Sequence, residues 1–174
     1  MNHSIETMKS TFEKLVIDFP NQVFMDIGKN HSTFIFKPNE IQVIELPIGF
    51  DFISTRYFKH TPPTYDEIEY AINYVEDEIE KVARSIPSDN HQLVTNTAYI
   101  RHITHLCGVA HSNAMPLSRA ALEALFGQYA EIAMGRPSRA NEADISPRFY
   151  AQLLILREVM HHMKFERITV IETA

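Results

Sequence analysis

The stretch from Val23 to Gly49 constrains the fold most strongly, because it predicts three successive strands. Val23 to Ile27 is a nearly uninterrupted apolar run, which is typical of a strand buried on both faces. Ser32 to Phe36 predicts the second strand and Ile41 to Ile48 the third, with a Lys-Pro-Asn-Glu turn between them. Asp26 stands near the end of the first strand, before a tight loop. This is a common place for a carboxylate beside a phosphate or its metal ion.

The rest of the chain predicts one compact α/β domain over 1–174. Thr64 and Glu67 form a capping box at the start of a long helix, and Ser146 with Pro147 starts another. This later helix is apolar around most of its circumference, so we expect it to lie in the middle of the domain or against a partner. The first predicted elements are a helix at 4–18, strands within 22–48, a helix at 64–85 and a strand at 91–95. Helices and a last strand follow within 98–171. The helices are at 100–107, 118–134 and 147–164, and the strand is at 167–171. They predict a mixed sheet of about five strands flanked by helices, with 51–60 irregular or briefly helical.

Charge and cysteine content disfavour several classes of function and location. A net charge of −6 and a pI near 5.8 oppose attraction to nucleic acid or to any long polyanion. No apolar run approaches the roughly 18 to 20 residues that cross a bilayer. One cysteine, Cys107, excludes an internal disulfide framework, and the first residues lack the pattern of a signal peptide. We therefore expect a reduced, cytoplasmic protein with no nucleic-acid partner and no membrane partner.

Four short motifs follow one another in an order that resembles a known family. They are Asp26-Ile-Gly-Lys-Asn-His-Ser-Thr, Glu45-Leu-Pro-Ile-Gly, Arg56-Tyr-Phe and Thr61-Pro-Pro-Thr. Their order and spacing resemble the second domain of the exopolyphosphatase and guanosine-pentaphosphate phosphatase proteins, the Ppx/GppA family. The resemblance continues through segments that begin at Leu93, Pro116, Ile145 and Phe165. It implies a ribonuclease H-like domain of the actin-like ATPase type.

The resemblance also implies a set of site residues. Those that would bind phosphate are Asp26, Gly28, Lys29, Asn30, His31, Ser32, Thr33, Thr95, Asn96 and Thr97. Asp26 would also hold Mg²⁺ or Mn²⁺ if the protein is active. Glu6 lies close to the place of the family's catalytic glutamate. The alternative for Glu6 is a solvated acid in the first turn of its helix, where the helix dipole favours negative charge.

The two loops contain fewer glycines than the phosphate-binding loops of the family. The family carries Asp-Ile-Gly-Gly-Gly-Ser in the first loop, where this chain has only Gly28, and the second loop, Thr95-Asn-Thr-Ala-Tyr, has no glycine. A chain that turns its N–H groups onto an anion visits left-handed conformations, which glycine tolerates. The first hypothesis is therefore a degenerate or divided domain that serves in binding, regulation or assembly and hydrolyses nothing alone.

Two alternatives stay open from the sequence. One is a phosphohydrolase of polyphosphate or guanosine pentaphosphate, completed by a chain that supplies the family's first domain or by a second copy. The other is a different interaction or metal-binding module. Its candidate ligands are His102, His105, Cys107 and His111, whose steps of three and four residues lack a specific zinc pattern. The expected partners are thus a second copy or a first-domain chain, and a phosphate-containing small molecule.

Overall fold

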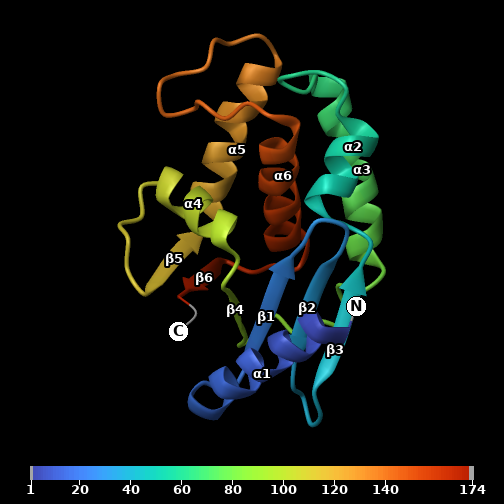
Figure 1. Ribbon diagram of the computed structural model, residues 1–174, viewed down its shortest axis with the longest axis vertical. Helices are drawn as coiled ribbons and strands as arrows, with labels where there is room; N and C mark the ends of the chain where they lie inside the picture. Colours follow the sequence, from blue (N-terminus) through green and yellow to red (C-terminus); the bar gives the residue numbers. More distant parts are fainter. Residues whose placement is uncertain (1, 173–174) are drawn as a thin grey trace.

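Within residues 2–172, which the computed structural model describes, the chain forms six helices and six strands (Figure 1). The domain predicted over 1–174 extends beyond the described residues at Met1, Thr173 and Ala174. The helices are α1 (Asn2–Asp18), α2 (Phe50–Tyr57), α3 (Tyr65–Glu80), α4 (Ala98–Leu106), α5 (Arg119–Ala133) and α6 (Pro147–His162). The strands are β1 (Gln22–Ile27), β2 (Ser32–Phe36), β3 (Gln42–Leu46), β4 (Gln92–Thr95), β5 (Ala114–Ser118) and β6 (Arg167–Ile171).

The strands form one mixed sheet in the order β3-β2-β1-β4-β6-β5. The first three pair antiparallel, β1, β4 and β6 pair parallel, and β5 pairs antiparallel with β6 at the edge. The α/β class and the mixed sheet are confirmed, but the prediction of about five strands missed β5. This strand contains Pro116, a residue that sheets accept mainly at an edge, and it ends where we placed the start of a helix, at Ser118.

The strand register shows which residues face which layer of helices. Phe24 of β1 is opposite Ile35 of β2, which is opposite Val43 of β3, so the three side chains point to one face of the sheet. Phe12 of α1 is buried against Phe24 and Ile35 on that face. The alternate residues of these strands point to the other face and join the large core with helices α2 to α6.

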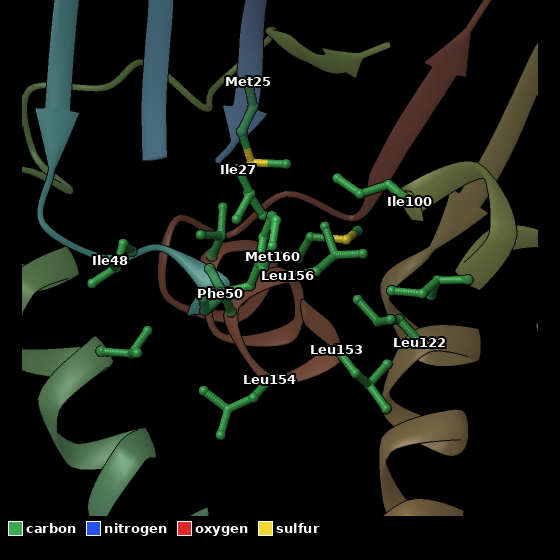
Figure 2. Packing of buried hydrophobic residues seen from close by; sticks show 14 of the residues in the cluster. Met25, Ile27, Ile48, Phe50, Ile100, Leu122, Leu153, Leu154, Leu156 and Met160 are labelled. Carbon is green, nitrogen blue, oxygen red and sulfur yellow. The ribbon is translucent and has the colours of Figure 1, made fainter. Parts of the chain in front are cut away.

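Helix α6 is the centre of the large core, as its apolar circumference predicts. It packs against α2, α3 and α5 (Figure 1). Figure 2 shows Leu153, Leu154 and Leu156 leaving the helix in different directions, each toward other apolar side chains. Ser146 caps the helix by accepting a hydrogen bond from the Phe149 N–H at 3.2 Å. The buried residues of α6 are Phe149, Tyr150, Ala151, Leu153, Leu154, Ile155, Leu156, Glu158, Val159 and Met160.

Several helix ends differ from the sequence-based expectation. The Thr64–Glu67 capping box is present, with hydrogen bonds of 3.0 and 3.3 Å, but α3 ends at Glu80 rather than at residue 85. Val82 and Ala83 continue the apolar stripe into the following turn, and this misled the prediction. The segment expected to be irregular or briefly helical contains the eight-residue α2. None of the described helices has the length and apolar character needed to span a bilayer.

Candidate functional site

The carboxyl end of β1 opens onto a hollow of about 260 Å³, bordered by the loop 28–31 (the first loop) and by α1. Asp26 is opposite Thr33 in β2, which is opposite Glu45 in β3, so the three side chains stand in a row on the α1 face of the sheet. Open α/β sheets bind ligands at the carboxyl ends of their strands, so this place suits a binding site. The hollow is lined by Ser4, Ile5, Met8, Asp26, Gly28, Lys29, Asn30, His31, Thr33 and Glu45.

The backbone of the first loop caps helix α2. The Gly28 carbonyl accepts from the N–H of Phe50, the first residue of α2, at 3.1 Å. The Lys29 carbonyl accepts from the next two N–H groups of the helix, at 2.9 and 3.1 Å. These are N–H groups that an α-helix leaves without an internal partner. The loop therefore satisfies the first three N–H groups of α2, which are not free to bind an anion.

The two peptide groups whose carbonyls cap α2 carry N–H groups that face away from the helix. In a trans peptide the N–H and C=O point in opposite directions, and the one cis peptide of the described residues is Thr61–Pro62. The N–H groups of Lys29 and Asn30 therefore point away from α2. Both residues line the hollow and are exposed. Two loop amides thus point away from the helix that the loop caps.

Gly49 permits this close approach of loop and helix. It precedes α2, and a Cβ on it would lie 2.3 Å from both Asn30 N and Lys29 O. Its φ of −130° and ψ of 154° suit any residue, so the position needs glycine for space and not for conformation.

Neither loop has the alternating backbone that forms an anion nest. Among the described residues, φ is positive at Asn21, Asn90, Gly108, Gly135 and Lys164. None of these lies in the first loop or in 95–99. In addition, the Gly28 N–H is used within the loop, since it donates to the His31 carbonyl at 2.8 Å. The first loop therefore offers fewer converging amides than a glycine-rich phosphate loop.

Asp26 is joined to the second loop by a chain of hydroxyl groups. The Thr97 hydroxyl donates to Asp26 Oδ1 at 3.0 Å, and the Thr95 hydroxyl donates to that of Thr97 at 3.0 Å. Burial raises the pKa of Asp26, and the hydrogen bond from Thr97 lowers it in part. The structure thus brings the two predicted loops together, but it engages these hydroxyl groups with each other and with Asp26.

Tyr99 links the second loop to the first. Its hydroxyl donates to the Ile27 carbonyl at 3.2 Å, and its ring packs edge-on against Phe50 with centroids 5.3 Å apart. Burial, with a smaller contribution from the charge of Asp26, raises the pKa of Tyr99 well above its usual range. The hydroxyl is therefore a hydrogen-bond donor that fixes the end of β1.

The predicted site residues fall into two groups. Asp26, Gly28, Lys29, Asn30, His31 and Thr33 line the hollow, whereas Ser32, Thr95, Asn96 and Thr97 are not among its lining residues. Ser32 is buried, and its hydroxyl donates to the Ile48 carbonyl at 2.6 Å. This hydrogen bond holds the start of β2 to the residues that follow β3.

Glu6, the predicted catalytic residue, is not among the residues that line the hollow. Its side chain is 70% exposed and forms an ion pair of 3.6 Å with Lys9. Ser4, Ile5 and Met8 of the same helix do line the hollow, and so does Glu45 of β3. Sequence reasoning missed Glu45 as a site residue. Pairing the second and third predicted strands across their turn would have placed it opposite Thr33.

A Mg²⁺ or Mn²⁺ ion at Asp26 would take most of its ligands from water or a bound phosphate. Among the described residues, no group of three His, Cys, Asp or Glu side chains at ligand distance includes Asp26.

The candidate ligands His102, His105, Cys107 and His111 also fail to gather into such a group within the described part of the chain. The rings of His105 and His111 stack with centroids 4.3 Å apart. Burial raises the pKa of Cys107 to about 11, which favours the thiol over the thiolate. The structure gives no support to a zinc cluster there.

Replacing Asp26 with asparagine is expected to stabilise the protein at about pH 7 and to have little effect at about pH 3. The folded-state pKa is raised above the usual 3.8, so the folded protein holds this proton more tightly than the unfolded chain. Stability is therefore lost as the pH rises through the folded-state pKa. Asparagine cannot ionise, and its carbonyl oxygen still accepts from Thr97. Urea unfolding at both pH values measures the effect, with the exposed Asp77→Asn as control. A D26N protein less stable than wild type at the higher pH contradicts this expectation.

Solved structures share this fold. The Ppx/GppA enzyme of Aquifex aeolicus matches with a TM-score of 0.68 at 19% sequence identity, over 87% of this chain and 53% of that one. The fold is that of a Ppx/GppA domain. An exopolyphosphatase-like protein matches with a TM-score of 0.69 at 15% identity, over 90% of this chain and 56% of that one. An exopolyphosphatase from Cytophaga hutchinsonii matches with a TM-score of 0.65 at 19% identity, over 88% of this chain and 53% of that one.

This chain spans about half the length of these solved structures. No family model matches the sequence, and no curated protein matches it either. The resemblance to Ppx/GppA proteins is confirmed for the fold, a mixed α/β sheet flanked by helices.

Proposed function

We propose that this chain is an exopolyphosphatase-related domain that binds a phosphate-containing small molecule and does not hydrolyse it alone. The observation that carries the proposal is the orientation of the first loop. Its carbonyl groups cap α2, and the N–H groups of Lys29 and Asn30 point away from the helix beside the hollow. Amide N–H groups and a lysine are the donors that phosphate groups accept. The domain then acts as a regulatory or assembly unit.

The positions of Glu6 and Asp26 do not favour an active enzyme. Phosphoryl transfer depends on positioned donors, a metal ion and a residue that orients the attacking water. Glu6 is exposed and paired with Lys9, and Asp26 belongs to no three-ligand group among the described residues. Losing a single well-placed donor typically lowers kcat by about a hundredfold to a thousandfold.

The rival function is a phosphohydrolase of polyphosphate or guanosine pentaphosphate that a partner chain or a second copy completes. The observation in its favour is the gathering of Asp26, Lys29, Asn30 and His31 at one hollow. In that case Glu6 activates the attacking water.

Tripolyphosphate is a suitable probe for the proposed function. We expect binding by calorimetry with no phosphate release above the buffer blank, with or without Mg²⁺ or Mn²⁺. Lys29→Gln should weaken binding by about tenfold, because it removes one charge-assisted hydrogen bond. Lys37→Gln, at an exposed lysine outside the hollow, should leave binding unchanged. Equal binding by the wild type and Lys29→Gln, or no binding by the wild type, refutes the proposal.

Phosphate release decides between the proposal and its rival. Turnover that is lost in both Asp26→Asn and Glu6→Gln but kept in Glu80→Gln, at an exposed position at the end of α3, establishes the rival.

For the assembly role, we propose that the partner is a second copy of this chain. Ile17 is 80% exposed and Phe19 is 59% exposed, both at the end of α1, and exposed apolar surface often marks an interface. Sedimentation at micromolar concentration should give about twice the chain mass of 20.1 kDa, and Ile17→Ser should reduce the dimer fraction. A wild-type protein that sediments as a monomer at this concentration contradicts the proposal.

A cytoplasmic location stays a prediction.

A further inference from the structure

Three metal-ligating side chains meet where α3 packs against the end of α6. They are Glu76 of α3 and Glu158 and His162 of α6, and one ligand atom of each lies within 4.8 Å of the others. His162 Nε2 lies 3.0 Å from a Glu76 oxygen and 3.2 Å from Glu158 Oε2. Glu158 and His162 are four residues apart and therefore share one face of α6. Among the described residues, this is the one group of three His, Cys, Asp or Glu side chains whose ligand atoms lie this close together.

The buried oxygen of Glu158 points to a cation. The Glu158 side chain is 0% exposed, and its Oε1 is held by Arg157 Nη1. Oε2 receives no hydrogen bond from the described residues, and its contact is the ion pair with His162 Nε2 at 3.2 Å. His162 Nε2 carries one proton or one lone pair, and its hydrogen bond is with Glu76. A buried carboxylate oxygen with no donor is costly, whereas a cation at this position satisfies both carboxylates and the ring nitrogen together.

We propose that Glu76, Glu158 and His162 bind one zinc-class transition-metal ion that fastens α3 to the end of α6. Ligand atoms around a tetrahedral ion with bonds of about 2.0–2.1 Å lie about 3.3 Å apart. The two distances at His162 Nε2 are close to this value. The Glu76 and His162 side chains are 35% and 22% exposed, so solvent reaches the ion and water completes its four ligands.

The surroundings favour this class of ion over others. One imidazole and two carboxylates suit zinc and similar divalent ions, whereas Ca²⁺ takes six to eight oxygen ligands and Mg²⁺ an octahedron of oxygens. Arg157 holds one oxygen of Glu158 and so directs the other toward the ion. His162 is the last residue of α6, where the helix dipole stabilises positive charge.

The proposal is tested with Zn²⁺ alone on untagged full-length protein treated with chelator. Calorimetry should give one ion per chain, and Zn²⁺ at a hundredfold excess over its Kd should raise the Tm by at least about 5 °C. His162→Gln and Glu76→Gln should each weaken binding by at least about a hundredfold, because each removes a direct ligand.

The neighbouring histidine gives a matched control. His161 is half exposed and pairs with Glu123 at 3.1 Å, outside the group of three. His161→Gln should therefore bind Zn²⁺ as the wild type does. Glu76 is partly exposed, so E76Q keeps the test valid if His162→Gln does not fold. Folded wild type that takes up no Zn²⁺, or a folded His162→Gln or Glu76→Gln variant that binds it as tightly as the wild type, overturns the proposal.

Discussion

Replacing Gly49 with alanine should lower the free energy of unfolding by about 3 kcal/mol. The added Cβ would lie 2.3 Å from Asn30 N and from Lys29 O, which are backbone atoms that cannot turn aside as a side chain can. Either the first loop or the start of α2 must move, and the hydrogen bonds between them are lost. Urea unfolding at equilibrium measures the change.

The matched control for this substitution is Gly127→Ala in α5. No atom lies within 4 Å of a Cβ built at Gly127, and alanine is a better helix former than glycine. This change should therefore raise stability by about 0.5–1 kcal/mol. The same chemical change is thus expected to act with opposite signs at the two glycines. A Gly49→Ala protein as stable as the wild type would mean that the loop does not approach α2 this closely.

Leu154→Ala and Leu156→Ala should each lower stability by about 2–5 kcal/mol. Residues two apart on a helix point to nearly opposite sides, so an amphipathic helix would bury only one of them. Both leucines are 0% exposed here, because α6 packs against α2, α3 and α5 (Figure 1).

The exposed apolar residue Met134, at the end of α5, provides the comparison for the two leucines. It is 63% exposed, and Met134→Ala should change stability by less than about 0.5 kcal/mol. A loss below about 1 kcal/mol for either leucine would mean that α6 has a solvent-facing side at that position.

The sequence predicts the fold well where one local pattern decides the structure. The apolar run of β1, the capping box at Thr64 and the Ser146–Pro147 start of α6 each rest on neighbouring residues. Strand β5 was missed because Pro116 and an adjacent helix start hide a five-residue edge strand. Only its pairing with β6, about fifty residues later in the chain, makes it a strand.

The site is less predictable because its key contacts join distant segments. The motif at Asp26 correctly placed an acid beside a loop, but its bond to Thr97 spans 71 residues. The contact between His162 and Glu76 spans 86 residues. Spacing within one helix could not show that α3 brings a third ligand to Glu158 and His162.

The first loop links ligand occupancy to the rigidity of α2. The peptide groups that carry the Gly28 and Lys29 carbonyls also carry the N–H groups of Lys29 and Asn30. An anion that accepts from these N–H groups polarises each peptide and strengthens its carbonyl as an acceptor. The three N–H groups at the start of α2 bond to those carbonyls, so we expect their hydrogen exchange to slow when a phosphate group fills the hollow. Helix α2 thereby reports a bound ligand that it does not itself touch.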